Sequence, residues 1–522
     1  KKKRKNIATK FFGNKNSISH DVVENLYKDK QDNLWVATDN GVDRFYLSNK
    51  SILFNQTDSG KKQLNESIEV NSFAEDSKGN IWIASNQGLI KYDKKKDNFI
   101  EFQPPQILHT KVSNLFINKN DNIWIATPGG INHFLSTRKT FDSYRAREGM
   151  NGYLETNYTS GAVEDKNGKL WVSTLNKGLF VLPKDKKDGN FTHFNFNFEN
   201  KSRFTVINGL TYDKNNNLWI STFTELIKLN VNNSEFTIVS ENENAPKNMI
   251  FNTYYDKEFW VAAVNGIFKW DQDINSFKKI TELNFQVKGF VVDGENIWLT
   301  SFSNLYKYTI SENVLKKIPS YLTLNVNFNN KGYKDTSGRI YFSSFEGFIS
   351  FDPSQITFNQ EDSNLRFTDF KVLGKSSSFD ADFYNDLLVN KPINELKKIE
   401  LKNNDNSFDI SFSSLNLIDS KNVTYNYILD GYDNDWKVLS NGSNIAKYEK
   451  VTPGTYTFKV FTNDSYGLKN NSSREFVITV NSPFYTTDLA ILIYCILVIT
   501  VLIVINRVLI SREQYNNKVE LE

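Results

Sequence analysis

The chain has 522 residues, enough for two to four domains that each bury a core. Its 63 basic and 60 acidic residues leave a formal charge of +3, which argues against a nucleic-acid or strongly acidic partner. The single cysteine, Cys495, excludes an intrachain disulfide. Aromatic residues make up 14% of the chain and only 10 residues are proline, a composition that favours an all-β protein.

The first five residues are basic and are followed by polar sequence in place of the apolar run that a signal peptide needs. We interpret this basic run as a solvated chain end; a nuclear-import or heparin-binding patch is the alternative. Because the chain does not begin with Met, we expect it to be a fragment or a processed product.

A repeat occupies residues 7–355. A period near 40 to 50 residues with about four short strands per copy is the spacing of β-propeller blades. The eight copies, aligned on one aromatic residue and separated by 38 to 48 positions, contain Trp35, Trp82, Trp124, Trp171, Trp219, Trp260, Trp298 and Tyr341.

Each copy combines a turn with a strand. In the turn Asp76–Asn80 the Asp can bond the backbone ahead of it, and Gly79 tolerates a positive φ. In the Ile-Trp-Ile-Ala-Ser that follows, the alternation of a strand sends Trp to one face of a sheet and the β-branched residues to the other. Since burying an indole removes roughly 150–250 Å² from water, we expect these aromatic residues to pack between blades and not to bind a ligand.

Copies of the form Asp-x-x-Gly-Asn-Ile-Trp-Ile-Ala-Ser-x-x-Gly-Leu-x-x-Tyr resemble the propeller repeats of bacterial two-component regulators, the sensor halves of hybrid histidine kinases. The resemblance implies seven-bladed rings, usually two in tandem, then a β-sandwich named for three tyrosines and a membrane span. Eight copies leave two interpretations. Either the last seven form one ring and the Trp35 copy is a remnant of a truncated upstream ring, or eight blades close through residues 8–12.

Residues 360–482 lose the repeat and carry short strands of alternating polarity, which predict an immunoglobulin-like or fibronectin-like β-sandwich. The string Val423–Trp436 followed by Pro453–Phe458 resembles the triple-tyrosine domain. On that match Tyr425, Tyr427 and Tyr456 are the naming tyrosines, and we expect them in the core or an interface.

Residues 488–506 are predicted to form a transmembrane helix, because 489–505 contain no charge across 17 positions. Arg507 and Arg512 then lie on the cytoplasmic side. This orientation predicts a single-pass protein of the inner membrane with residues 1–487 in the periplasm, and residues 507–522 as the start of a cytoplasmic signalling helix.

No catalytic motif is present, and the four histidines lack metal-ligand spacing, so we expect no cofactor and no metal. The best binding candidate is the connection between repeats at residues 144–158. It carries Arg145, Arg147, Tyr153 and Asn157, side chains that hold acidic sugars through guanidinium forks and neutral sugar rings through stacking.

The main hypothesis is a membrane-anchored sensory ectodomain of a two-component regulator. The resemblance implies an oligosaccharide or other small ligand, a homodimer, no nucleic acid bound by the ectodomain, and a histidine kinase or DNA-binding output beyond this chain. One alternative is a membrane-tethered propeller enzyme, a polysaccharide lyase or hydrolase, since fold does not fix function. A structural adhesion scaffold is another.

Overall fold

The computed structural model describes residues 18–519 with internal gaps. The segments outside the described residues are 30–32, 47–51, 57–63, 65–67, 148–152, 185–188, 197–204, 242–244, 247–249, 265, 319–325, 357–364, 377–392, 396, 416–422, 440–442 and 464–468. The chain divides into two compact units, Lys1–Phe358 and Asn359–Glu522.

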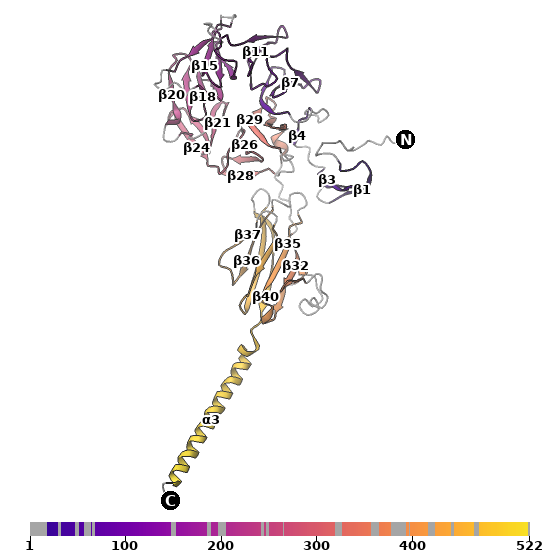
Figure 1. Cartoon of the computed structure of the whole chain (residues 1–522), viewed down its shortest axis with the longest axis vertical. Helices are drawn as coiled ribbons and strands as arrows, with labels where there is room; N and C mark the ends of the chain where they lie inside the picture. The colour runs from indigo at the N-terminus through magenta and orange to yellow at the C-terminus, as the bar shows by residue number, and fades with distance from the viewer. Residues whose placement is uncertain are drawn as a thin grey trace. The chain divides into compact units, whose positions relative to one another are not determined.

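Seven four-stranded antiparallel sheets form the blades of a propeller in the first unit (Figure 1). The first three blades are β5 (Val70–Glu75), β6 (Ile81–Ser85), β7 (Gly88–Asp93), β8 (Asn98–Phe102); β9 (Asn114–Ile117), β10 (Ile123–Thr127), β11 (Gly130–Leu135), β12 (Thr140–Tyr144); and β13 (Thr159–Glu164), β14 (Leu170–Thr174), β15 (Leu179–Leu182), β16 (Thr192–Phe194).

The next three blades are β17 (Gly209–Tyr212), β18 (Asn217–Ser221), β19 (Leu226–Asn230), β20 (Phe236–Ile238); β21 (Ile250–Asp256), β22 (Glu258–Ala263), β23 (Gly266–Asp271), β24 (Ser276–Thr281); and β25 (Phe290–Asp293), β26 (Asn296–Thr300), β27 (Leu305–Thr309), β28 (Val314–Lys317). The seventh blade joins β29 (Phe328–Lys334), β30 (Ile340–Ser344) and β31 (Gly347–Phe351) to β4 (Ile52–Phe54) from far upstream.

The strand β4 closes the ring. It pairs antiparallel with β31, with Leu53 opposite Ser350, so the chain enters the last blade before it builds the first. Closure of this kind removes exposed sheet edges. The ring therefore has seven blades, as in the first of the two interpretations drawn from the sequence; the origin of the Trp35 copy stays a prediction. Residues 8–12, the closing segment of the eight-bladed alternative, lie outside the described residues.

The Trp35 copy does not join the ring. Its strands β1 (Val23–Lys28), β2 (Asn33–Thr38) and β3 (Gly41–Tyr46) form a three-stranded sheet of their own. Every residue of β1 is exposed, including the large apolar side chains of Leu26 and Tyr27. This sheet is one blade repeat without blade neighbours among the described residues.

The acidic residue of the repeat has a second role that the sequence did not disclose. Asp76 accepts hydrogen bonds from the backbone of the turn, as expected, and its other oxygen accepts from Trp82 Nε1 at 3.1 Å. The same bond, six residues apart, links Asp29 to Trp35, Asp165 to Trp171, Asp213 to Trp219 and Asp335 to the hydroxyl of Tyr341. One carboxylate thus satisfies both a turn and a buried aromatic donor.

The aromatic residues of the seven blades are buried, and the Trp35 ring is half-buried. A cation from the neighbouring third strand lies over most of the indoles. Examples are Lys91 over Trp82 at 5.2 Å and Lys269 over Trp260 at 5.6 Å. Cation–π contacts of this kind contribute about 0.5–2 kcal/mol each.

The antiparallel order sorts the loops onto two ends of the ring. Turns between the first and second and between the third and fourth strands of a blade lie at one end, which we call the Asp-turn end. Turns between the second and third strands lie at the opposite end, together with the connections from each fourth strand to the next blade. We call this opposite end the connection end.

The second unit holds a β-sandwich of two sheets, with strand orders β33-β32-β35-β38 and β34-β40-β39-β36-β37. Its strands are β32 (Arg366–Val372), β33 (Lys375–Ser376), β34 (Lys398–Leu401), β35 (Phe408–Ser413), β36 (Thr424–Asp430), β37 (Lys437–Leu439), β38 (Ile445–Tyr448), β39 (Gly454–Asn463) and β40 (Lys469–Val480). Short 3₁₀ turns are η2 (Val239–Glu241) in the ring and η3 (Pro353–Gln355) after it, then η4 (Ile393–Glu395), η5 (Asn403–Asp405) and η7 (Phe484–Thr486).

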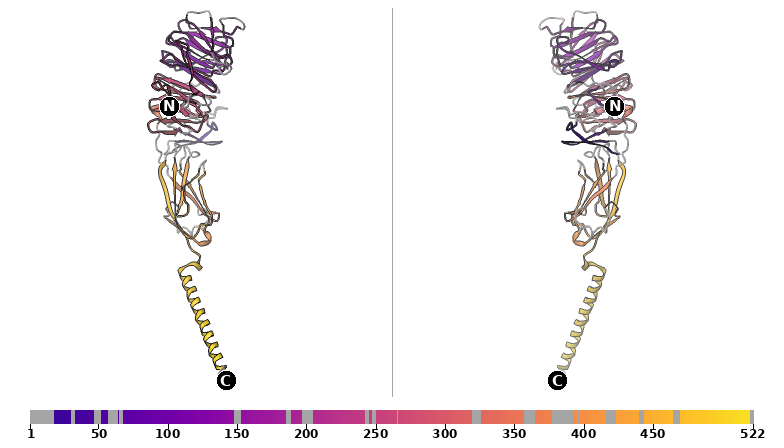
Figure 2. Two further views of the ribbon diagram at one scale, coloured as in Figure 1. Left: turned by 90° about the vertical axis from the view of Figure 1, so that its left-hand side faces the viewer. Right: turned by 90° about the vertical axis from the view of Figure 1, so that its right-hand side faces the viewer.

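The helix α3 (Asp488–Val519) runs without a break for 32 residues, as Figure 2 shows. At roughly 1.5 Å per residue it is longer than the hydrocarbon core of a bilayer, about 30 Å. An 18-residue window of its stretch Asp488–Asn517 has a mean hydropathy of 3.0 and no buried residue, so the helix is long and apolar enough to cross a membrane. The polar residues from Ser511 onward continue the same helix.

Candidate functional site

The predicted binding segment, residues 144–158, connects the second blade to the third and lies at the connection end. Residues 148–152 are outside the described residues. The two described arms are tied together, because Arg147 N donates to Leu154 O at 3.2 Å and Ala146 N donates to the Asn157 side chain at 2.7 Å. The segment therefore folds back on itself.

The structure brings two of the predicted binding residues into contact. The guanidinium carbon of Arg147 lies 4.5 Å from the Tyr153 ring centroid, and Nη1 of Arg147 donates to the Tyr153 hydroxyl at 3.2 Å. Arg145 and Arg147 are both exposed, and Asn157 uses its side-chain oxygen within the loop. The loop thus offers two cations at a surface, one of them oriented by an aromatic ring.

Hydrogen bonds attach this loop to the third blade and the second blade to the third. Leu175 N, in the turn after β14, donates to Tyr158 O at 3.0 Å. Thr159 Oγ1 donates to Thr127 O at 2.9 Å and accepts from Thr127 N at 3.0 Å, which joins the second blade to the third. The connection end is held rigidly at this point, a condition for a preorganised binding surface.

A set of exposed apolar side chains at the same end was missed by the sequence analysis. Each member follows its repeat aromatic by four residues, in the turn between the second and third strands, and the exposed fractions are 43–55%. We call the set the apolar rim; it consists of Leu175, Phe223, Val264, Phe302 and Phe345. Comparing the copies position by position would have found it, since the other two blades have Asn86 and Pro128 there.

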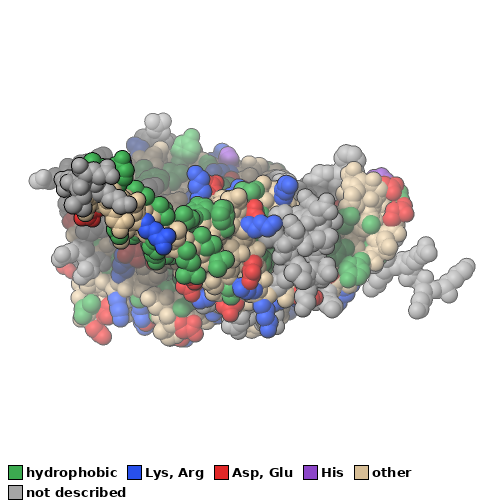
Figure 3. Space-filling view, turned by 90° about the horizontal axis from the view of Figure 1, so that it is seen from below, with side chains coloured by type: hydrophobic (Ala, Val, Ile, Leu, Met, Phe, Trp, Pro, Cys, Tyr) green, Lys and Arg blue, Asp and Glu red, His purple; other side chains and the backbone are tan. Residues whose placement is uncertain are grey.

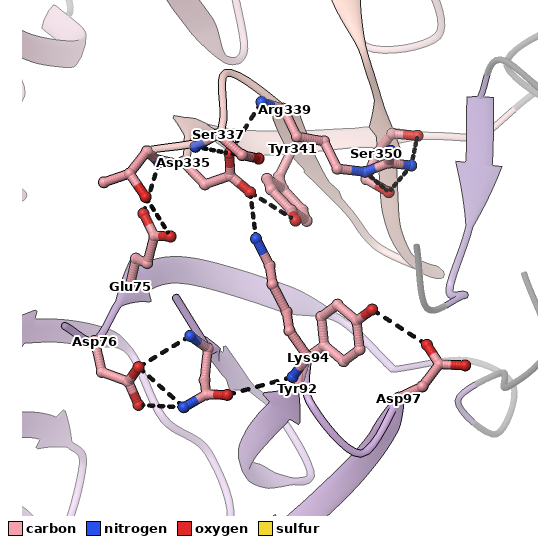
Figure 4. A network of polar contacts seen from close by, with 12 residues as sticks. Glu75, Asp76, Tyr92, Lys94, Asp97, Asp335, Ser337, Arg339, Tyr341 and Ser350 are labelled. Atoms are coloured by element: carbon pink, nitrogen blue, oxygen red, sulfur yellow. Dashed lines mark hydrogen bonds and ion pairs between the residues drawn. The ribbon is translucent and has the colours of Figure 1, made fainter. Parts of the chain in front are cut away.

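The Asp-turn end differs in chemistry. Where the first and last blades meet, Lys94 Nζ contacts Asp335 Oδ2 at 2.8 Å, and Glu75 accepts from the backbone and hydroxyl of Thr336 (Figure 4). Although burial opposes ionisation, hydrogen bonds from Lys94 and Ser337 keep the pKa of Asp335 below its usual value. These contacts join the last blade to the first.

Two clefts open at the Asp-turn end. One of about 300 Å³ is lined by Asp213, Tyr255, Lys269 and Asp271 among others, and one of about 460 Å³ by residues that include Asn296 and Lys307. Both hold side chains of either charge. On the face shown in Figure 3, basic and acidic side chains are likewise interspersed, as the near-balanced composition predicts.

The four histidine side chains stack on an aromatic ring or hydrogen-bond to the backbone. The His133 ring stacks on Trp124 at 3.7 Å, and burial lowers its pKa. His193 Nε2 lies 2.8 Å from Lys177 O, and the Nδ1 atoms of His20 and His109 accept from backbone N–H groups two residues ahead. In the described part of the chain no group of three His, Cys, Asp or Glu side chains is placed to hold a metal.

The three tyrosines of the sandwich lie in its core. Tyr425 and Tyr427 project from β36 and Tyr456 from β39, and all three are buried. The Tyr425 hydroxyl accepts from Ser414 N at 3.0 Å, and the Tyr456 hydroxyl donates to Thr452 O at 2.9 Å. Each of these two phenols therefore pins a loop to the sheet beneath it.

Two family models match the sequence. The model described as "Two component regulator propeller" matches residues 17–40 and 63–87, and the "Y_Y_Y domain" model matches residues 416–481. A curated relative, histidine kinase P4 of Formosa agariphila, is 29% identical over 233 residues, which are 44% of this chain and 16% of the kinase.

Solved structures share the fold. The extracellular domain of a putative hybrid two component system from B. thetaiotaomicron has a TM-score of 0.74 at 20% identity, covering 91% of this chain and 64% of its own. That of a putative one component system from the same organism has a TM-score of 0.52 at 20% identity, covering 91% and 65%. This chain thus spans less than two thirds of each relative's length.

These findings confirm the resemblance drawn from the repeats. The chain carries two-component regulator propeller repeats and a Y_Y_Y domain, in that order, and then one candidate membrane span among its described residues. This order of domains is the one that the resemblance to two-component regulators implied.

Proposed function

We propose that this chain is the periplasmic sensor and inner-membrane anchor of a two-component regulator, and that its signal is an oligosaccharide bound at the connection end of the ring. One observation carries the choice of site. Two exposed arginines, one stacked on Tyr153, and the apolar rim occupy the same end, whereas the polar groups at the blade junction of the Asp-turn end bond to one another.

The charges at this site favour ligands with an acidic group near the 144–158 loop. Arginine forms paired hydrogen bonds to carboxylate or sulfate oxygens in a fixed plane, so it selects for geometry as well as for charge. Arg145 and Arg147 are separated by one residue and are both exposed, so they are available to such groups. The aromatic ring of Tyr153 supports the orientation of Arg147.

Transmission requires that the ligand favour one arrangement of the receptor over another. We propose a homodimer in which ligand binding changes contacts between copies and α3 passes the change to a kinase or DNA-binding output in the cytoplasm. A 100-fold preference for one arrangement would bias the equilibrium by about 2.7 kcal/mol. The uninterrupted helix past Arg507 suits this role, because it continues beyond the length needed to cross a bilayer.

The positions of the basic residues in α3 support the proposed orientation in the membrane. Arg507 and Arg512 follow the apolar stretch of α3 closely, and basic residues near a span favour the cytoplasmic side. Residues 1–487 then face the periplasm, where glycans released outside the cell can reach them.

A calorimetric titration tests the proposal. The full chain in lipid nanodiscs is titrated with purified hexasaccharides, both neutral (β-1,4-linked glucose, mannose and xylose) and acidic (galacturonate and alginate fragments). We expect saturable binding of at least one of them without release of new reducing ends. A panel without binding would contradict the ligand class, and turnover would contradict a purely sensory role.

A further inference from the structure

The apolar rim is not required by turn chemistry. Tight turns favour Gly, Asn, Asp and Ser because these residues tolerate special backbone angles or bond to the local backbone. Leu, Phe and Val offer neither property, yet they occupy the same turn position in five consecutive blades. A single exposed apolar residue needs no explanation, but exposed apolar residues that neighbour one another indicate a binding surface.

The backbone beneath the rim is held in place. Phe345 N donates to Asn327 O at 2.9 Å, and Leu175 N makes the equivalent bond to Tyr158 O at 3.0 Å. Phe302 O accepts from Phe328 N of the next blade. Because these turns are fixed to neighbouring strands, the exposed side chains are presented without a loop having to order on binding.

Two of the three phenylalanines of the rim are neighbours, on the last two blades. The Phe302 and Phe345 rings are 6.1 Å apart between centroids and tilted by 44°, and both are about half-exposed. Each of these two mutually tilted rings leaves about half of its surface in solvent. The C–H faces of pyranose rings are matched surfaces for aromatic rings of this kind.

An acidic residue comes directly after Phe345 in the same turn. Glu346 follows Phe345, and its carboxylate accepts from Asn327 N at 3.1 Å and from Asn327 Nδ2 at 2.9 Å. An ionised carboxylate has about four acceptor sites, so capacity for sugar hydroxyls remains. Its negative charge disfavours a carboxylated or sulfated ring at this position, in contrast with the arginines near the second blade.

We propose that Phe302 and Phe345 form a stacking subsite for neutral sugar rings, with Glu346 accepting their hydroxyls. The inference rests on the proposed function and deepens it. The connection end then has two chemically distinct parts, an acidic-group site at Arg145 and Arg147 and a neutral-ring subsite at Phe302 and Phe345.

The test uses the full chain in nanodiscs and the neutral hexasaccharide that binds it in the titration above. Phe302→Ala and Phe345→Ala should each weaken binding about tenfold or more, because each removes one stacked ring. Phe345→Trp should retain binding, and its indole fluorescence should shift to shorter wavelength as the sugar covers it. Ile274→Ala, which removes an exposed apolar side chain from the Asp-turn end, should change nothing.

The outcomes separate the two proposals. Binding to the unaltered chain that is indifferent to both Phe→Ala variants, with no spectral shift in Phe345→Trp, would overturn the subsite and leave the sensor proposal standing. Binding of acidic hexasaccharides alone would also overturn the subsite. Absence of binding across the whole panel would contradict the ligand class itself.

Discussion

Replacement of Trp219 by alanine is expected to lower the free energy of unfolding of the ring by about 3–5 kcal/mol. The indole is fully buried, lies 3.9 Å from the Phe259 ring in a near-parallel stack, and meets Trp270 edge-on at 5.0 Å. Since Phe259 belongs to the next blade, the cavity would open between blades. Asp213 would also lose the hydrogen bond from Nε1, at 2.8 Å.

Denaturant unfolding of the full chain in detergent, followed by tryptophan fluorescence, measures this loss. Of the nine tryptophans only Trp436 lies outside the first unit, so the signal reports mainly on that unit. Trp35→Ala is the matched control, because Trp35 has the same bond to an Asp six residues earlier but belongs to the separate sheet. Equal decreases in the free energy of unfolding for the two variants would contradict the account that Trp219 stabilises the ring by packing between blades.

Asn55→Ala is expected to destabilise the closed ring by about 2–5 kcal/mol, since it leaves one buried and one partly buried backbone group without the bond from Asn55. Asn55 Oδ1 accepts from Phe348 N at 2.8 Å, and Nδ2 donates to Glu346 O at 2.9 Å. These bonds join Asn55, the residue after β4, to the turn before β31 and to Phe348 within β31. A decrease of less than 1 kcal/mol in the free energy of unfolding would show that the Asn55 side-chain hydrogen bonds contribute little to ring closure.

The control for Asn55 separates hydrogen bonding from backbone strain. Asn55 has a φ of 51°, and an alanine at a positive φ is itself destabilising. Asn275 has a φ of 48° and is exposed. Asn275→Ala therefore introduces the backbone strain without removing buried hydrogen bonds. The difference between the two variants in free energy of unfolding gives the contribution of the Asn55 side-chain hydrogen bonds.

The repeat, the sandwich and the apolar helix could be predicted from the sequence, because each has a period or a length that local chemistry imposes. Copies such as Ile81–Ser85 alternate over a fixed spacing, and residues 489–505 carry no charge. The closing strand could not be predicted. Ile52–Phe54 resembles any other outer strand of the repeat, and its place is decided by pairing with β31, almost 300 residues later in sequence.

The candidate site was predictable only in part. The arginines and tyrosines of residues 144–158 are conspicuous in sequence, but their mutual contact depends on how the loop folds. The apolar rim was missed because turns are expected to be polar. The bond between Asp76 and Trp82 was missed for a related reason, since the turn alone accounts for an Asp at that position.

Closure by β4 is the central claim, because it fixes the number of blades in the ring that carries the 144–158 loop and the rim. The direct test is a disulfide cross-link in the full chain carrying Leu53→Cys and Ser350→Cys, with Cys495→Ser to remove the native thiol. Leu53 and Ser350 are paired residues, so oxidation should give an intrachain bond and a faster-migrating band on a non-reducing gel. A cysteine at 350 that fails to link to position 53, yet links to one placed by Phe12→Cys, would contradict the seven-bladed ring.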